Sequence, residues 1–191
     1  IWPNDVSFVH LHTHTEFSML DGAALVGDAV AAAKADGQPA LAITDHGNMY
    51  GVLDFYQACR DADITPIIGT EAYMAHESRT ERPARRGRVD DSGGDTKGGR
   101  KLYYHLTLLA QNRAGYRNMI QLASRAFLEG YFYKPRVDWE LLDEHSEGLI
   151  ATTACLGGHV LQALMAGDEA EALARAGRLQ DIFGKENLFV E

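Results

Sequence analysis

Three histidines stand at alternate positions near the start of the chain, in the stretch HLHTHTEFSMLDG of residues 10 to 22. Side chains alternate between the two faces of a strand, so His10, His12 and His14 would point the same way if a strand ran through all of them. If the strand ends near His12, then His14 lies on the loop beyond it. Imidazoles two residues apart at a strand end can reach one cation, so the spacing predicts a metal site. The alternative is three polar residues on an exposed edge, which is costly for a strand in a doubly covered parallel sheet.

Further residues of metal-binding type follow other predicted strands. His46 lies in TDHGN, Glu71 in GTEAY and Cys155 in TTACLGG. In parallel α/β proteins the residues just beyond the strand ends converge on the active site. A single such residue is more often structural, but several after successive strands favour a metal centre. His105 is the exception, since it opens its predicted strand. Imidazole, carboxylate and thiolate together suit zinc, manganese or iron better than magnesium.

The elements that must position these residues follow from apolar spacing. Strands are predicted at 8–12, 40–44, 65–73, 105–110, 148–153 and 187–191. Helices are predicted at 25–36, 49–62 and 112–130, from Asp138 onward, and at 158–166 and 168–183. In the third helix the apolar residues Tyr116, Met119, Ile120, Ala123 and Phe127 share one face. The alternation predicts an α/β fold with a parallel sheet and helical crossovers. Periodicity alone does not decide between an open doubly wound sheet and a closed barrel.

Residues 76–101 are the one long insertion without a regular pattern, and such loops are usually functional or disordered. Residues 79–101 hold eight basic and four acidic side chains, a net charge of +4 in a chain of −9, which leaves −13 for the remainder. Arg85 and Arg86 could therefore contact a DNA backbone. A solvated insertion is the alternative, and we favour it.

Composition narrows the class of protein. With 191 residues, of which 46% are hydrophobic, the chain is long enough for one domain with a real core. No apolar run approaches the roughly 20 residues of a membrane-spanning helix, and the first residues do not resemble a signal peptide. The two cysteines suit a reducing compartment, with Cys59 predicted as a buried thiol in a helix. We therefore expect a cytoplasmic protein.

Several stretches together resemble a known family. HLHTH, the LDG that follows it, TDHGNMYG and PIIGTEAY are similar to the polymerase and histidinol phosphatase (PHP) domain. HLTLLAQNRAGYRNMIQLAS, YKPRVD and EGLIATTACLGG resemble the branch at the N-terminus of bacterial replicative DNA polymerase III alpha subunits. The resemblance runs from Phe8 to Glu191. It implies a distorted, TIM-like (β/α)7 barrel and one PHP domain at 1–191, the N-terminal part of a larger polymerase, with an insertion at about 76–101.

The resemblance also implies a set of metal ligands. Members of the family hold up to three divalent ions with nine side chains, and we expect zinc first, with manganese or iron as alternatives. Seven of the nine positions match residues of this chain: His12, His14, Asp21, His46, Glu71, His105 and Cys155. The other two form an Asp-x-His motif, and the chain ends at Glu191 before one occurs, so we expect the C-terminal part of the domain to be missing. His10 matches a flanking position.

The activity implied is that of a metal-dependent phosphoesterase. In a DNA-directed DNA polymerase this is a proofreading 3′→5′ exonuclease, with His12, His14, Asp21, His46 and Glu71 as catalytic residues. Three anionic ligands against six positive charges of three ions would leave the site attractive to a phosphodiester. Glu71 is our choice for a carboxylate that bridges two ions, while Asp45 either supports the ligands or caps a turn. The implied partners are DNA at the 3′ end of a primer strand, the polymerase core of the same full-length chain and replisome subunits such as the sliding clamp, with no membrane.

Three alternatives stay open. The domain could be a non-catalytic docking platform for a separate proofreading exonuclease, but ligand-type residues at all seven positions favour an active site. It could be a phosphomonoesterase of the histidinol phosphatase kind, against which the polymerase-like stretches after residue 100 argue. It could also belong to the error-prone paralogue of the polymerase, although TDHGNM and PIIGTEAY favour the replicative form.

Overall fold

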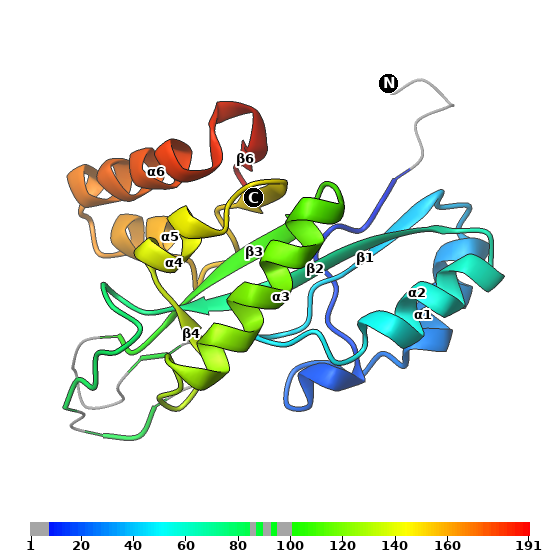
Figure 1. Ribbon diagram of the computed structural model, residues 1–191, viewed down its shortest axis with the longest axis horizontal. Helices are drawn as coiled ribbons and strands as arrows, with labels where there is room; N and C mark the ends of the chain where they lie inside the picture. The colour runs from blue at the N-terminus through cyan, green and yellow to red at the C-terminus, as the bar shows by residue number, and fades with distance from the viewer. Residues whose placement is uncertain (1–7, 85–86, 90–92, 95–100) are drawn as a thin grey trace. The chain divides into compact units, whose positions relative to one another are not determined.

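The computed structural model describes residues 8–84, 87–89, 93–94 and 101–191. The chain divides into two compact units, residues 1–70 and 71–191. Strand β2 (Thr65–Met74) begins in the first unit and ends in the second. Strands and helices alternate along the chain (Figure 1), which confirms the α/β class that the sequence predicts. The strands form a mixed six-stranded sheet in the order β1-β2-β3-β5-β6, with β4 paired to β2.

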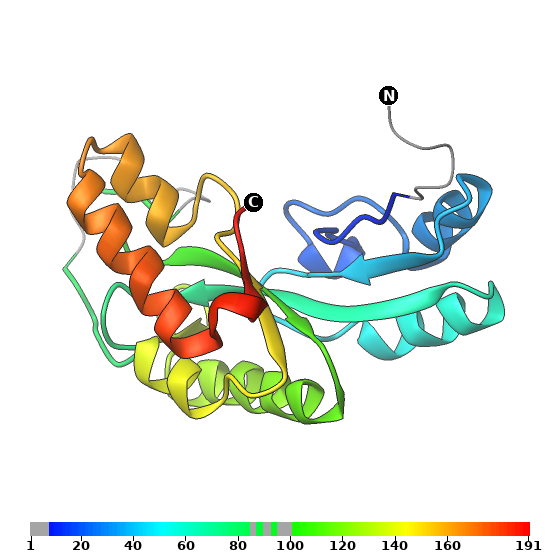
Figure 2. The same cartoon turned by 90° about the horizontal axis from the view of Figure 1, so that it is seen from above.

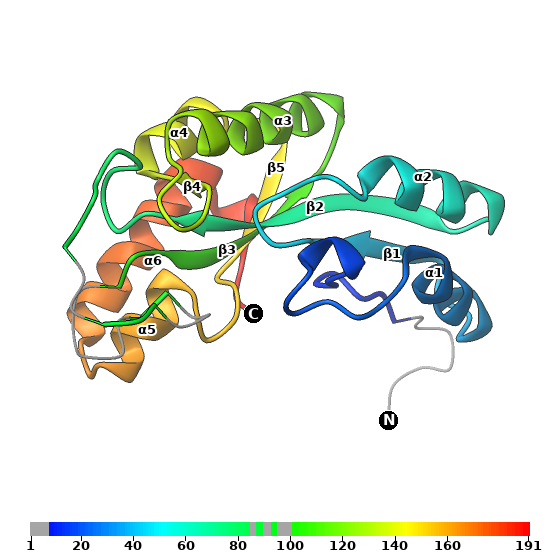
Figure 3. The ribbon, with the colours of Figure 1, turned by 90° about the horizontal axis from the view of Figure 1, so that it is seen from below.

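In the first unit, two helices pack on a parallel strand pair. The elements are the 3-10 helix η1 (Glu16–Ser18), α1 (Val26–Ala35), β1 (Ala40–Ile43), α2 (Val52–Asp61) and the start of β2. Ala40 pairs with Thr65, and the register continues to Ile43 and Ile68. Helices α1 and α2 contact each other and β1. In Figure 3, α1 is seen beside β1 and α2 beside β2. Their buried side chains recur every three or four residues, as expected for one helix face, and form a core with the strands: Val26, Val30, Ala33, Leu41, Ile43, Val52, Phe55, Cys59 and Ile64.

The strand predicted at 8–12 does not form, and this prediction was wrong. The segment runs beside β1 and makes two backbone hydrogen bonds, from Ala42 N to His10 O at 3.0 Å and from Thr44 N to Thr13 O at 2.9 Å. His10 and Thr13 are three residues apart, whereas their partners Ala42 and Thr44 are two apart. The extra residue interrupts the ladder, as at a β-bulge. The segment is therefore held next to β1 without regular strand pairing.

The second unit places helices on both sides of its strands. After β2 come β3 (Tyr104–Ala110), α3 (Arg113–Leu128), β4 (Arg136–Val137), α4 (Trp139–Glu144), β5 (Leu149–Thr152), α5 (His159–Met165), α6 (Glu169–Phe183), η2 (Lys185–Asn187) and β6 (Leu188–Phe189). Helix α3 lies along one side of β3 and α5 along the other (Figure 2). Asn112 caps α3 and Asp138 caps α4 with their side chains, at the positions where the sequence predicts these helices to begin.

The sheet is not wholly parallel, which corrects the prediction of parallel strands throughout. The pairs β1–β2, β2–β4 and β5–β6 are parallel, but β3 and β5 are antiparallel, with Leu108 opposite Ala151. A single helical crossover returns the chain to the same end of a sheet and gives parallel strands. Between β3 and β5 the chain instead passes through α3, β4 and α4. The short strand β4, which the sequence pattern did not predict, adds a traverse and lets β5 run the other way.

The insertion is anchored by buried arginines. Arg136 is 1% exposed and donates hydrogen bonds to the carbonyls of Gly130, Leu102, Arg79 and Glu81. Arg79 is also buried and forms ion pairs with three carboxylates, those of Glu129, Asp138 and Glu140. These ion pairs neutralise the charge of Arg79 within the second unit. The insertion therefore carries less unpaired positive charge than its composition indicates. Arg85 and Arg86 lie outside the described residues. Among the described residues, no helix is both long and apolar enough to cross a membrane.

Candidate metal centre

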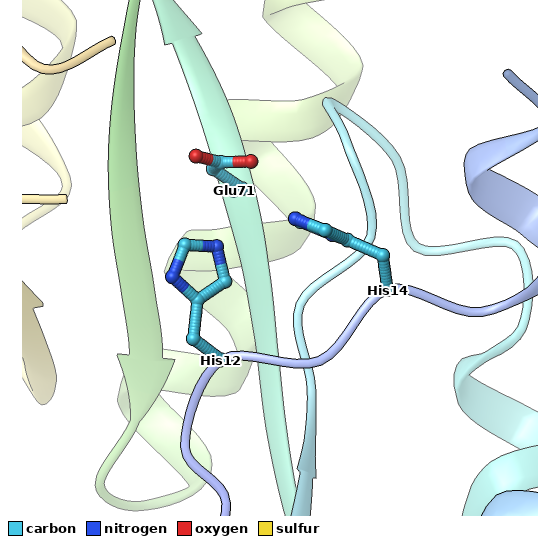
Figure 4. A group of neighbouring side chains, drawn as sticks. All are labelled: His12, His14 and Glu71. Atoms are coloured by element: carbon cyan, nitrogen blue, oxygen red, sulfur yellow. The ribbon is translucent and has the colours of Figure 1, made fainter. Parts of the chain in front are cut away.

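The first unit gathers three side chains of metal-binding type in one cluster. His12 and His14 extend from the irregular segment before β1 (Figure 4), with ring centroids 4.9 Å apart. The ring of His14 stacks on that of His46 at 4.0 Å. His46 Nε2 lies 2.7 Å from Asp21 Oδ2. One ligand atom from each of His14, Asp21 and His46 lies within 4.8 Å of the other two, so residues up to 32 positions apart meet at one point.

A buried aspartate fixes the two loops that carry this cluster. Asp45 is 2% exposed, and its carboxylate accepts hydrogen bonds from Thr15 N at 2.7 Å, Thr15 Oγ1 at 2.8 Å and Ser18 Oγ at 2.6 Å. Ser18 Oγ in turn accepts a hydrogen bond from His46 N at 3.2 Å. The loop before Asp21 is thereby fastened to the turn that carries His46. Asp45 is thus a positioning residue, one of the two roles that the sequence left open for it.

The turn after β1 is itself closed by polar contacts. Gly47 has φ +61°, a conformation in which most side chains are strained. Thr70 Oγ1 donates to the carbonyls of Asp45 at 2.9 Å and Asn48 at 3.1 Å. Asn48 Nδ2 donates to the carbonyls of His46 and Phe17, at 3.0 and 3.2 Å. These bonds explain how a short TDHGN sequence holds an imidazole in one place.

A second cluster lies within the second unit. Glu71 extends from β2 (Figure 4) and is 1% exposed. Its Oε1 lies 2.9 Å from His105 Nδ1. Cys155 Sγ lies 3.5 Å from both of these atoms. A carboxylate, an imidazole and a thiol thus face one another.

The antiparallel pairing of β3 and β5 explains why His105 belongs to this cluster. His105 lies near the start of β3, where a ligand in a parallel strand would stand at the wrong end of the sheet. Because β5 runs the other way, its end and the loop with Cys155 lie beside the start of β3. His105 N donates to Gly157 O at 3.1 Å, which fastens strand and loop together. The exception noted from the sequence is therefore a consequence of mixed strand direction.

The thiol of Cys155 is not poised to ionise by itself. Burial raises its pKa, with a smaller contribution from the nearby Glu71 charge, and this outweighs the hydrogen bond from Gly157 N. A cysteine binds metal as the thiolate, and coordination removes its proton. With its pKa raised, the thiol is protonated at neutral pH, so it would become a ligand only if a bound cation displaced its proton.

The donor types and spacing fit divalent ions. Imidazole nitrogens and carboxylate oxygens bind zinc, manganese and iron, and thiolate favours zinc and iron. The 2.7 Å contact of His46 with Asp21 is a hydrogen bond, shorter than the about 3.3 Å between two ligand atoms on a tetrahedral ion. Since metal ligands must be deprotonated, an ion would replace the proton of this bond.

A cavity of about 580 Å³ adjoins the first cluster. Its lining includes His12, His14 and Asp21 together with the small side chains of Ala29 and Ala32. Its size is that of small-molecule sites in proteins. The cluster therefore faces open space.

His10 and Cys59 lie where the sequence predicts them, outside the two clusters. The ring of His10 contacts Phe8 at 4.7 Å and stands outside the groups of metal-ligand type found among the described residues, in keeping with its flanking position. Cys59 is a fully buried thiol, as predicted. Sequence reasoning missed Thr15 and Ser18, whose hydroxyls connect Asp45 to the cluster. Hydroxyl residues are common in loops, and only the nearby buried Asp45 could have indicated their role.

Comparison with known proteins agrees with the resemblance found in the sequence. The chain belongs to the PHP domain family, whose model matches residues 10–191. DNA polymerase III subunit alpha of Treponema pallidum is 47% identical over 186 residues, which cover 97% of this chain and 15% of that protein. The same subunit of Saccharopolyspora erythraea is 48% identical over 191 residues, covering 96% of this chain and 16% of that protein. The chain thus spans only about a sixth of these relatives.

One solved structure is similar in backbone only. An amidohydrolase from Chromobacterium violaceum, with bound sulfate and no metal, is 12% identical, with a TM-score of 0.48. The match covers 95% of this chain and 84% of that one. The family membership therefore comes from the sequence.

Proposed function

We propose that the chain is the PHP domain of a bacterial DNA polymerase III alpha subunit and a metal-dependent 3′→5′ exonuclease. The observation that carries the proposal is the cluster of His14, Asp21 and His46, whose ligand atoms lie within 4.8 Å of one another. The proposed ligands are the seven residues predicted from the sequence: His12, His14, Asp21, His46, Glu71, His105 and Cys155. Zinc is the first choice of ion, with manganese and iron as alternatives.

The chemistry divides between ion and protein. When bound, divalent ions lower the pKa of a water to about 7 and neutralise charge on a phosphodiester. Asp45, through Thr15 and Ser18, keeps Asp21 and His46 at a fixed separation. Glu71 is the proposed bridging carboxylate, because its two oxygens can serve two ions. Glu71 and His105 are both buried, 1% and 8% exposed, so water has little access to their ligand atoms.

The substrate class follows from the relatives. Two proteins named DNA polymerase III subunit alpha are 47% and 48% identical to this chain over 186 and 191 aligned residues. For the whole protein we propose DNA at the 3′ end of a primer strand as substrate. Its partners would be the polymerase core of the same chain and replisome subunits such as the sliding clamp, in the bacterial cytoplasm.

The test compares the intact protein with Asp21→Asn. We expect the intact protein to retain divalent metal and to release nucleotides from the 3′ end of single-stranded DNA. Asp21→Asn should bind less metal, and its rate of hydrolysis should fall at least 10-fold. Tenfold is the lower end of the effect of removing a group that orders a metal site. Asp54→Asn is the matched control, since it changes an acid in the first turn of α2.

Three outcomes would contradict the proposal. Full hydrolysis by metal-free protein would exclude a metal mechanism. Faster hydrolysis of a small phosphomonoester than of DNA would favour the phosphatase alternative. Bound metal without any hydrolysis would favour the docking-platform alternative.

A further inference from the structure

An exposed aromatic ring stands on the turn that carries His46. Tyr50 is 64% exposed, whereas Asp45 and Asn48 of the same turn are 2% and 7% exposed. Tyrosine combines an apolar ring with a polar hydroxyl, and it is enriched at binding interfaces for that reason. Within the turn, the chain buries its polar residues and presents its largest apolar one to solvent.

The backbone that carries the ring is rigid. Tyr50 N donates to Asn48 Oδ1 at 3.0 Å, and Asn48 Nδ2 binds the carbonyl of His46. The same amide binds the carbonyl of Phe17 at 3.2 Å. At the following residue, a Cβ on Gly51 would lie 2.5 Å from the Phe17 ring, so the turn and η1 are in close contact there. The separation between Tyr50 and the imidazole of His46 is thus set by a closed network.

We propose that Tyr50 stacks on the unpaired base of the 3′-terminal nucleotide of single-stranded DNA. The inference rests on the proposed function, in which His46 belongs to a centre that holds the phosphodiester. A base is joined to its phosphate through one sugar, and Tyr50 follows His46 by four residues in a tight turn. Aromatic side chains bind single-stranded bases by stacking without sequence preference, as a proofreading site requires. Base pairing withdraws a base from such a surface, so Tyr50 would favour frayed or mismatched ends.

The experiment measures steady-state hydrolysis by the intact protein on two single strands. One strand ends in a normal 3′ nucleotide, and the other ends in an abasic sugar. We expect Tyr50→Ala to raise KM for the normal strand about tenfold and to leave kcat unchanged, since stacking binds the ground state as well as the transition state. On the abasic strand, Tyr50→Ala and the unaltered protein should have the same KM. Tyr50→Phe and Tyr50→Trp should behave as the unaltered protein does.

Leu53→Ala is the matched control, because Leu53 is 76% exposed on α2 but lies beyond the turn. An unchanged KM for Tyr50→Ala on the normal strand would overturn the inference. An equal rise on both strands would overturn it too, since that pattern indicates a structural role or a surface for another protein. If the unaltered protein hydrolyses neither strand, the proposed function fails. The role of Tyr50 is then tested by the dissociation constants of the two strands, for which the same differences between the variants are expected as for KM.

Discussion

At the scale of single residues, hydrogen bonds to one buried carboxylate organise the first cluster. Asp45 accepts three hydrogen bonds from Thr15 and Ser18, and none of these residues is a proposed ligand. Residue type and position after predicted strands indicated that His14 and His46 gather, and the family resemblance added Asp21. They did not predict Thr15 or Ser18, because a hydroxyl acquires a role only when the fold brings an acceptor to it. Ligation itself stays a prediction.

Replacing Asp45 by asparagine tests its positioning role. The amide nitrogen cannot accept, so at least one buried donor from Thr15 or Ser18 loses its partner. We expect the free energy of unfolding to fall by about 1–3 kcal/mol and metal affinity to fall about 10–100-fold. Urea unfolding and calorimetric metal titration measure the two effects. Lower stability with unaltered metal affinity would show that Asp45 does not support the cluster.

His159 gives a pH dependence to stability. Its ring is buried against Tyr104, its Nε2 donates to Ala75 O, and its Nδ1 faces the guanidinium of Arg175. Burial and the Arg175 charge lower the pKa of His159 from 6.5 to about 2. Below pH 6.5 the unfolded chain therefore takes up a proton that the folded chain refuses. The stabilising effect is complete above pH 6.5 and is lost as the pH falls toward 2.

Unfolding in urea at pH 7, 6 and 5 measures this effect. The unaltered chain should lose about 1 kcal/mol of unfolding free energy for each pH unit below about 6. His159→Gln cannot titrate there, so its stability, although lower at pH 7, should fall less steeply. Parallel pH profiles for the two proteins would contradict the assignment.

At the scale of elements, the strands and helices were mostly predictable, and the failures have physical causes. The predicted strand at 8–12 has the right composition, but an extra residue breaks its ladder with β1. Strand β4 has two residues, too few for a periodic pattern. In α3 the predicted apolar face includes Tyr116 and Phe127, which are each 37% exposed. The buried face is shifted, with Gly115, Met119, Leu122 and Ala126.

Glycine explains the shift of α3. A Cβ on Gly115 would lie 1.8 Å from the backbone oxygen of Gly148, so the helix approaches the loop before β5 through a residue without a side chain. Apolar spacing counts large side chains and cannot register this contact. Gly115→Ala should lower the free energy of unfolding by about 1–3 kcal/mol, as other overpacked sites do.

The control for this change is Gly177→Ala in α6, where a Cβ would meet nothing within 4 Å. Alanine there should raise stability by up to about 1 kcal/mol, the difference in helix propensity. Both values come from urea unfolding. Equal effects of the two substitutions would show that Gly115 has no special packing role.

At the scale of the whole molecule, charge is uneven along an acidic chain. The insertion is its basic segment, yet the charge of Arg79 is neutralised by ion pairs with Glu129, Asp138 and Glu140. Hydrogen bonds from Arg125 and from Arg79 lower the pKa of the Glu129 carboxyl from 4.5 to about 2. Composition could predict the basic segment but not this internal pairing, because the acids come from 50 or more residues away.

Charge reversal of Arg85 and Arg86 tests the remaining basic residues. We expect the doubly substituted protein to keep its DNA affinity and the slope of that affinity against salt concentration, because we favour a solvated insertion. Binding measured between 50 and 200 mM salt reports the number of phosphate contacts, since each contributes close to one unit of slope. A slope reduced by about two would show that both arginines contact the backbone.

The most direct test of the metal centre is anomalous X-ray scattering from crystals of the intact protein, with data at the zinc and manganese edges. We predict a peak about 2.0–2.3 Å from ligand atoms of His14, Asp21 and His46. An ordered crystal of catalytically active protein without any peak beside these three residues would contradict it.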